Sequence, residues 1–218
     1  MAHPYFHAVS SSRKFGGSFK DYLALHTWFD ATKAHIADPA HRSLRHNLES
    51  IELTTRIFGD TITTSDGSTV PVTEVGQQHV HEDCGFIPTS EEWAGALAVQ
   101  SWMTRGAPEI PVLLSKSVAR WGGAPEDYRE IHEFFDGAGA MSPLAAGLTR
   151  HHAAGIFLAE EVFGVTLTNS DGRTVPVRYL GELHMTLEFN RIPSPVDWLK
   201  AIRPKPWMRS IGVKDVGR

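Results

Sequence analysis

The sequence contains a single cysteine, Cys84, among its 218 residues. One cysteine excludes an intramolecular disulfide and any zinc site built from several thiolates. The sequence also lacks a nucleophile elbow, a phosphate-binding loop, a dinucleotide-binding fingerprint and a paired cysteine–histidine motif. No reaction is therefore indicated by a motif, and we assign no catalytic residue from the sequence.

Long hydrophobic runs and a surplus of basic charge are missing as well. No apolar run approaches the ~20 residues of a membrane span, and the first residues show no apolar core typical of a secretory signal. The 21 basic and 25 acidic residues give a net charge of −4 with neutral histidine, which disfavours nucleic acid as a partner. We therefore expect a cytoplasmic protein that binds no membrane.

The most informative feature is an internal duplication. About thirty paired positions are identical between the two halves, which indicates duplication of one unit. The matched segments, in chain order, are residues 16–30 with 122–136, 56–80 with 161–185, 86–93 with 191–198, and Trp102-Met103 with Trp207-Met208.

Each repeat combines helical spacing with one hairpin. Residues 19–37 and about 40–57 show the apolar spacing of helices, and Gly59 stands where a helix would end. Residues 61–72 read as a β-hairpin with an Asp-Gly turn. A short helix is expected near residues 77–85, and Thr89 begins another that carries Trp93.

These elements predict an α+β fold made of two homologous α-α-β-β-α units packed as a pseudo-twofold pair. The expected boundaries are residues 1–103 for the first unit, 104–121 for a linker and lead-in, and 122–218 for the second unit. The chain would then be a monomer that contains its own pseudo-dimer, with further self-association left open.

Histidine is abundant, with 12 residues, and four histidines of the first repeat have an acid three or four positions later. Such a pair lies on one helix face, so it offers an imidazole nitrogen and a carboxylate oxygen to one point. The pairs are His26/Asp30, His35/Asp38, His46/Glu49 and His79 with Glu82 or Asp83.

The duplication separates recurring from non-recurring polar residues. The histidines His26, His46 and His79 recur as His132, His151 and His184, and Asp30 recurs as Asp136. Glu49 and Glu82 face Ala154 and Leu187, whereas Asp83 faces Glu188 and keeps its charge. The second copy therefore reads as a decayed site, or the recurring residues only hold the fold.

The pattern leads to two hypotheses. In the first, repeat one binds a divalent metal, zinc first and then iron or manganese, through His26, His46 and His79 with help from Glu49, Glu82 or Asp83. If such a site left one coordination position open, the protein would be a metal-dependent hydrolase. In the second, the protein is a non-enzymatic structural or interaction module whose histidines form a polar core network.

Several short motifs also resemble a family. They are Met-Ala-His-Pro-Tyr at residues 1–5, His-x-x-Phe-Asp at 26–30, Lys33-x-His35, His41-Arg42 with Arg45-His46, Phe58-Gly59, the Asp66-Gly67 turn, Val70-Pro71-Val72, Gly-x-Gln-His-Val-x-Glu-Asp at 76–83, Ile-Pro, and Pro-Trp-Met at 206–208. The chain resembles a domain of unknown function found in short bacterial and phage proteins. That resemblance implies a fused pair of units and no particular activity.

Cys84 has a separate interpretation. It aligns with Phe189, which indicates an apolar position. We therefore expect a buried structural thiol there, in preference to a ligand or nucleophile.

Overall fold

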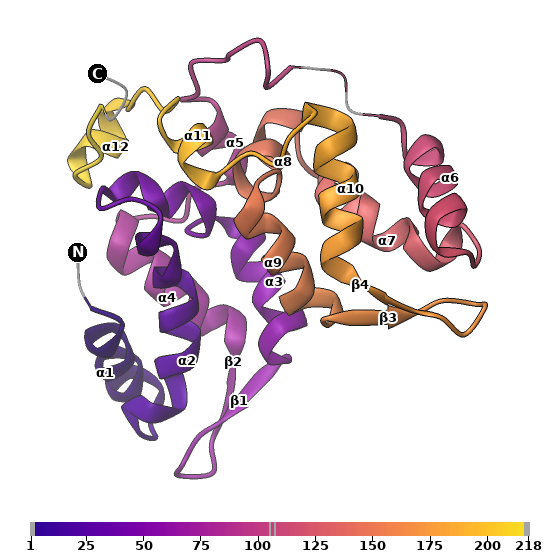
Figure 1. Ribbon diagram of the computed structural model, residues 1–218. Coiled ribbons are helices and arrows are strands. Elements are labelled where there is room, and N and C mark those ends of the chain that lie inside the picture. The colour runs from indigo at the N-terminus through magenta and orange to yellow at the C-terminus, as the bar shows by residue number, and fades with distance from the viewer. Residues whose placement is uncertain (1–2, 105, 107, 216–218) are drawn as a thin grey trace. The chain divides into compact units, whose positions relative to one another are not determined.

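The structure, a computed structural model, describes residues 3–104, 106 and 108–215 (Figure 1). The chain forms two units. Unit 1 comprises Met1–Ala96 and Ile202–Arg218, and unit 2 comprises Leu97–Ala201. Residues 1 and 2 of the opening motif, 105 and 107 of the expected linker, and 216–218 of the second repeat lie outside the described residues.

Unit 1 begins with two α-helices and ends its repeat with a short one. Its elements are α1 (Pro4–Phe15), α2 (Phe19–Asp30), the 3₁₀ helices η1 (Ala31–Ala34) and η2 (Pro39–Leu44), α3 (Leu48–Phe58), β1 (Thr61–Thr63), β2 (Thr69–Pro71), α4 (Val72–Cys84), α5 (Ser90–Ala94) and the C-terminal α12 (Pro206–Ser210).

Unit 2 repeats this order. Its elements are α6 (Ile110–Trp121), α7 (Glu126–Phe135), the 3₁₀ helix η3 (Gly137–Gly139), α8 (Pro143–Arg150), α9 (Ala153–Phe163), β3 (Thr166–Thr168), β4 (Thr174–Pro176), α10 (Val177–Phe189) and α11 (Pro195–Leu199). The α+β class and the two similar units are thus confirmed.

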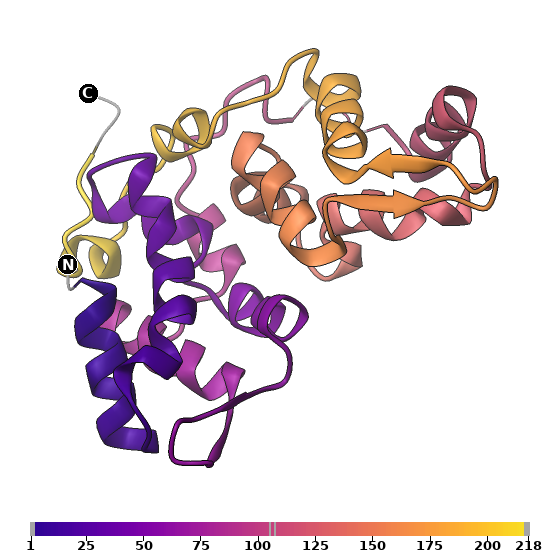
Figure 2. The ribbon, with the colours of Figure 1, turned by 60° about the horizontal axis from the view of Figure 1, so that its bottom comes forward.

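Each unit carries one antiparallel hairpin at an end of its helices (Figure 2). In unit 1 the register pairs Thr61 with Pro71, so the proline lies at the end of an edge strand, where its missing N–H costs no ladder bond. The hairpin tip is tied to the α1–α2 turn, because the Asp66 carboxylate accepts from the Gly17 N–H at 2.7 Å. Gly17 has φ of +66°, and an added Cβ would lie 2.7 Å from Thr64 Cβ. This turn therefore requires glycine.

The prediction of one continuous helix over residues 40–57 is wrong. Residues 39–44 form the 3₁₀ helix η2, and α3 begins only at Leu48. Asn47 causes the break, because its side chain accepts from the Ser50 N–H at 2.8 Å and caps a new helix. His46 therefore lies in a turn instead of on a helix face.

Two further differences concern helix starts. Residues 4–15 and 110–121 form α1 and α6. No helix was expected over the first of these segments, and the second falls in the expected linker and lead-in. The helix expected near residues 77–85 already begins at Val72, directly after the hairpin. Helix α4 therefore has 13 residues and presents three full turns to the core.

The last segment of each repeat packs in the unit formed by the other repeat. In unit 1, the Trp207 ring lies 4.7 Å from the Trp93 ring, edge to face. In unit 2, Trp102 contacts Trp198 at 4.9 Å in the same manner. The two Trp-Met segments thus exchange places between the repeats in which they are encoded.

None of the described helices is both long and apolar enough to cross a lipid bilayer.

Candidate metal centre in unit 1

Three elements bring four polar side chains to one buried point in unit 1. Asp30 is the last residue of α2, and His79 and Asp83 lie one turn apart on α4. His46 lies in the turn between η2 and α3. The ligand atoms of these four residues all lie within 4.8 Å of one another, and all four residues are buried.

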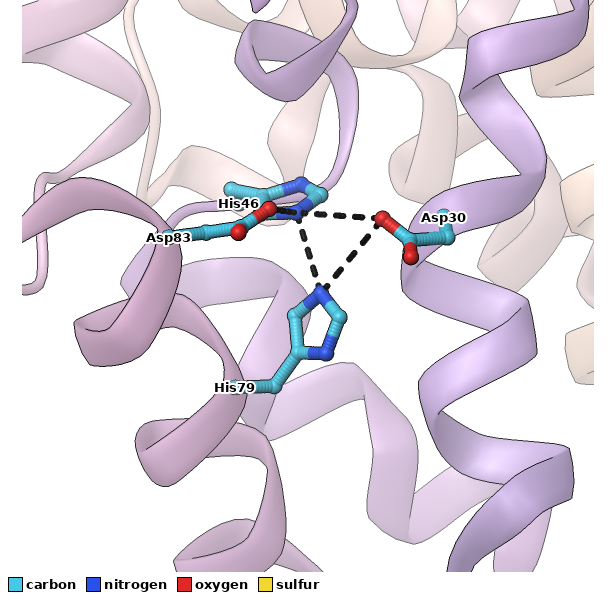
Figure 3. Close-up of side chains that lie close together, drawn as sticks. All are labelled: Asp30, His46, His79 and Asp83. Atoms are coloured by element: carbon cyan, nitrogen blue, oxygen red, sulfur yellow. Dashed lines mark hydrogen bonds and ion pairs between the residues drawn. The ribbon is translucent and has the colours of Figure 1, made fainter. Parts of the chain in front are cut away.

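The two imidazoles and two carboxylates point toward a common centre (Figure 3). His46 Nε2 lies 3.1 Å from His79 Nε2 and 3.2 Å from Asp83 Oδ2. Asp30 Oδ1 lies 3.9 Å from His46 Nε2 and 3.8 Å from His79 Nε2. The donor set is therefore two nitrogens and two oxygens.

These separations fit a metal coordination shell. Two ligands at about 2.0–2.1 Å from a tetrahedral ion lie roughly 3.4 Å apart. The two closest pairs in unit 1, at 3.1 and 3.2 Å, lie slightly below this value, and the Asp30 oxygen, at 3.8 and 3.9 Å from the two imidazole nitrogens, lies a few tenths of an ångström above it. Small movements of Asp30 would complete a four-ligand shell.

Each of the two carboxylates at the site lies beside one protein cation. Asp83 Oδ2 accepts from Arg42 Nε at 3.1 Å, and the Lys33 ammonium lies 2.7 Å from Asp30 Oδ1. Neither Asp30 oxygen has a hydrogen bond of good geometry, although both atoms are buried. A buried carboxylate without aligned donors is costly, and a bound cation would remove that cost.

The histidines are held in the neutral form, the form that binds metal. Burial, the largest effect, lowers the pKa of His46 although Asp83 opposes it. Burial likewise lowers the pKa of His79 well below its usual value. Burial opposes ionisation of Asp83, but hydrogen bonds from His46 and His7 outweigh it and lower the pKa of that carboxyl.

A chain of hydrogen bonds fixes the orientation of His79. His79 Nδ1 lies 2.9 Å from His26 Nδ1, and His26 Nε2 lies 2.8 Å from Ser11 Oγ. The Ser11 hydroxyl donates to Gln78 Oε1 at 3.0 Å, and the Gln78 amide donates to Glu82 Oε1 at 2.7 Å. Burial lowers the pKa of His26 to about 3, so this ring is a neutral relay.

The direction of donation follows from the Gln78 end of this chain, because the Ser11 hydroxyl donates to Gln78 Oε1 and therefore accepts from His26 Nε2. If His79 Nδ1 carries the proton and donates to His26 Nδ1, the His26 proton lies on Nε2 and is donated to Ser11. His79 Nε2 then has its lone pair directed toward His46 and the two carboxylates. Such outer partners set the tautomer of metal-binding histidines.

Three of the six residues expected as ligands, His46, His79 and Asp83, come together at this centre. The other three lie elsewhere. His26 orients His79, and Glu82 accepts hydrogen bonds from Gln78. Glu49 Oε2 accepts from the Ser90 N–H at 2.8 Å, at the start of α5.

Three functional neighbours were not assigned from the sequence. Asp30 was noticed as a recurring partner of His26 but was not placed among the expected ligands. Ser11 recurs as Ser117, but both precede the segments that were matched between the repeats. His7 also precedes them and aligns with Leu113, so no repeat signal identified it.

His7 connects the centre to a pocket. Its Nδ1 lies 2.6 Å from Glu82 Oε2, and its Nε2 lies 3.4 Å from Asp83 Oδ1. Burial lowers the pKa of His7, but the two carboxylates outweigh it and the net shift is upward. A pocket of about 560 Å³, lined by these side chains and Arg42, lies on the outer side of Asp83.

Cys84 is buried, as expected, and burial raises the pKa of its thiol to about 12. A thiol that stays protonated is a poor nucleophile and a poor metal ligand. Among the residues that the structure describes, Cys84 is not part of the group at the centre.

Comparison with known families identifies two matching stretches. The model of a domain of unknown function, DUF6915, matches residues 2–103 and again residues 114–208. No curated protein and no solved structure matches the chain.

Proposed function

We propose that this chain, which belongs to the DUF6915 family of domains of unknown function and contains that domain twice, is a metalloprotein with a buried divalent-metal site in unit 1. The ligands are Asp30, His46, His79 and Asp83. The single observation that carries the proposal is the convergence of their four buried donor atoms within 4.8 Å.

The chemistry of the donors favours a first-row transition metal. Imidazole suits zinc and iron, and carboxylate oxygen also suits manganese. Two neutral imidazoles and two carboxylates carry a charge of about −2, and Arg42 and Lys33 already lie beside the carboxylates. The donor types and their convergence, and not charge balance, therefore support an ion in unit 1. Zinc is the first choice, because it accepts four mixed nitrogen and oxygen ligands without a strong geometric preference.

The number of ligands bears on whether the site is catalytic. A catalytic zinc keeps one position for water, whereas four protein ligands occupy all the positions of a tetrahedral ion. With zinc, the geometry therefore favours a structural metal over the hydrolase. Iron or manganese with five or six ligands would leave positions for water, and the pocket beside His7 and Asp83 would then supply access.

The competing interpretation is a polar network without metal. It is supported by the continuous hydrogen-bond chain from Ser11 through His26 to His79. That chain, however, ends at a centre where neither oxygen of the buried Asp30 carboxylate has an aligned hydrogen-bond donor, which a hydrogen-bond network does not satisfy.

Metal removal tests the proposal. An ion at 1,000 times its dissociation constant stabilises the folded state by about 4 kcal/mol, which corresponds to roughly 8–16 °C in Tm for a chain of this size. We expect a chelator to lower the Tm of the untagged wild-type protein. His79→Ala should lose one equivalent of metal, measured by elemental mass spectrometry.

The network interpretation predicts different results. Chelator would leave Tm unchanged, no metal would co-purify in stoichiometric amount, and His79→Ala would destabilise by only about 1–3 kcal/mol through unpaired partners. That combination of results would reject the metal site.

A further inference from the structure

Unit 2 contains a second convergence of donor atoms, built from its own residues. The ligand atoms of Asp136, His151 and His184 all lie within 4.8 Å of one another. Glu188 follows His184 by one turn of α10. It is not one of these three residues, but its Oε2 lies 2.9 Å from His151 Nδ1 and 3.7 Å from His184 Nε2, so it borders the group on the histidine side. Asp136 Oδ1 lies 3.4 Å from His184 Nε2.

Three of these donor atoms are buried and have no aligned hydrogen-bond partner: His151 Nδ1, His184 Nε2 and Glu188 Oε2. Their residues are 3%, 0% and 9% exposed. The three atoms lie close to one another, but none is oriented to form a hydrogen bond with another. Ligands of one metal ion have this arrangement, because their lone pairs point at the ion and not at each other.

The tautomer of His151 strengthens this argument. Its Nε2 lies 2.8 Å from the carbonyl oxygen of Phe135, which can only accept. Nε2 therefore carries a proton, which leaves Nδ1 as the atom that faces the Glu188 carboxylate. Neither Nδ1 nor Glu188 Oε2 has an aligned hydrogen bond, and a cation bound by both atoms would satisfy them.

The substitutions between the two units compensate one another in length. His46 offers Nε2, the ring nitrogen farther from its backbone, and is paired with the short Asp83. His151 offers the nearer nitrogen Nδ1 and is paired with Glu188, which is longer by one methylene. The longer acid side chain in unit 2 thus compensates for the ring nitrogen that lies nearer the backbone, and the donor atoms still converge.

Protein cations do not balance the acids of unit 2. Gly147 and Gly139 stand where unit 1 has Arg42 and Lys33. Within the described part of the chain, the ion pairs of Asp136 and Glu188 are with histidine alone. Two carboxylates beside neutral imidazoles need a positive charge, which a divalent ion provides.

From these observations we infer that unit 2 holds a second divalent-metal site, with Asp136, His151, His184 and Glu188 as ligands, so that the full chain binds two ions. The Asp136 side chain is 30% exposed, whereas that of Asp30 is 3% exposed. The ion in unit 2 is therefore the more accessible to solvent and to chelator.

Metal counting on the full-length, untagged chain tests the inference with zinc as the probe. We expect two equivalents in the wild type, one in His184→Ala, one in His79→Ala and none in the double variant. Removal by chelator should show two phases, of which the faster is absent in His184→Ala. Circular dichroism checks that each variant folds.

Glu188→Gln provides the decisive variant if His184→Ala does not fold, because it changes charge with almost no change in volume. It should lose the second equivalent at limiting zinc, and Glu182→Gln, on the same helix, should retain it. One equivalent in the wild type that is lost only in His79→Ala would overturn the second site and leave the first intact. One equivalent in the wild type that is lost only in the unit 2 variants would overturn the unit 1 site and leave the unit 2 site intact. A wild-type protein that binds no zinc would overturn both sites.

Discussion

At the scale of single residues, the same side-chain type has different roles according to its neighbours. His79 and His46 direct nitrogens at the centre, whereas His26 uses both of its nitrogens in the chain from His79 to Ser11. His7 lies between two carboxylates, and its pKa is raised in spite of burial. Ligand identity is therefore decided by which atom faces the centre and not by histidine as such.

Asp83 and Glu82 are adjacent in sequence, but only Asp83 contributes to the centre. We predict that Asp83→Asn weakens metal binding by more than about 100-fold, beyond the 10–100-fold typical of outer partners. Glu82→Gln should weaken it by less than about 10-fold, because Glu82 is four hydrogen bonds away from His79 along the chain through His26, Ser11 and Gln78. Isothermal titration of each variant with zinc measures both effects, and equal losses would contradict the assignment.

The serine that supports the histidine chain offers a matched pair across the units. Ser11 contacts His26 and Gln78, whereas its counterpart Ser117 contacts His132 alone among the described partners. Ser11→Ala leaves two buried groups unpaired and should cost about 2–4 kcal/mol, against about 1–2 kcal/mol for Ser117→Ala. Urea unfolding measures the difference, and a larger loss in Ser117→Ala would argue against the chain described for unit 1.

At the scale of elements, close helix contacts place the ligand-bearing helices. His79 stacks on Phe29 at 4.9 Å, and His184 lies 5.1 Å from Phe135. In each unit the phenylalanine directly precedes the aspartate of the centre. The packing of the aromatic ring and the position of the carboxylate are thus set by the same helix end.

Two equivalent helix glycines test this packing. A Cβ at Gly181 would lie 2.9 Å from Phe135 Cζ, whereas at Gly76 the nearest atoms would be 3.3 Å away. Gly181→Ala should therefore destabilise by about 1–3 kcal/mol, although alanine favours helices. Gly76→Ala should change stability by less than about 1 kcal/mol. Thermal unfolding compares them, and equal effects would refute the packing difference.

At the scale of the whole molecule, neither repeat completes its own unit. Residues 202–218 belong to unit 1, although the sequence encodes them at the end of the second repeat. Trp207 covers Trp93 there, and Trp102 does the same for Trp198 in unit 2. Each unit therefore combines residues from both repeats.

This exchange predicts the behaviour of a single repeat. A fragment of residues 1–103 lacks Trp207, so its Trp93 would be uncovered until a second copy supplies Trp102. We expect the fragment to be a dimer by light scattering, and Trp102→Ala in the fragment to reduce dimerisation. A folded monomeric fragment would show that the exchanged segment is dispensable.

The fold was largely predictable, because its signals are local. The hairpin turn at Asp66, the cap at Thr89 and the helix end at Gly59 all lie where their residue types indicate. The helix expected over 40–57 was wrong, because apolar spacing continued through Asn47, whose side chain caps a new helix instead. Apolar periodicity alone does not show where a cap interrupts it.

The candidate site was predictable only in part. Spacing placed His79 and Asp83 on one face, since four residues make about one helical turn. Glu49 satisfied the same spacing rule but caps α5 through Ser90, and His26 faces His79. Distances between side chains of different elements depend on packing, and sequence spacing within one element does not contain them.

The sequence by itself determined the duplication, the α+β elements and the histidines shared by both halves, because identity and local propensity are written along the chain. The tertiary structure alone decided that Asp30 joins His46, His79 and Asp83, and that Asp136 joins His151 and His184 in unit 2 with Glu188 in contact with His151. It also decided which unit receives each terminal Trp-Met segment. These outcomes depend on contacts between residues far apart in the chain, which only the packing of helices against one another brings within a few ångströms.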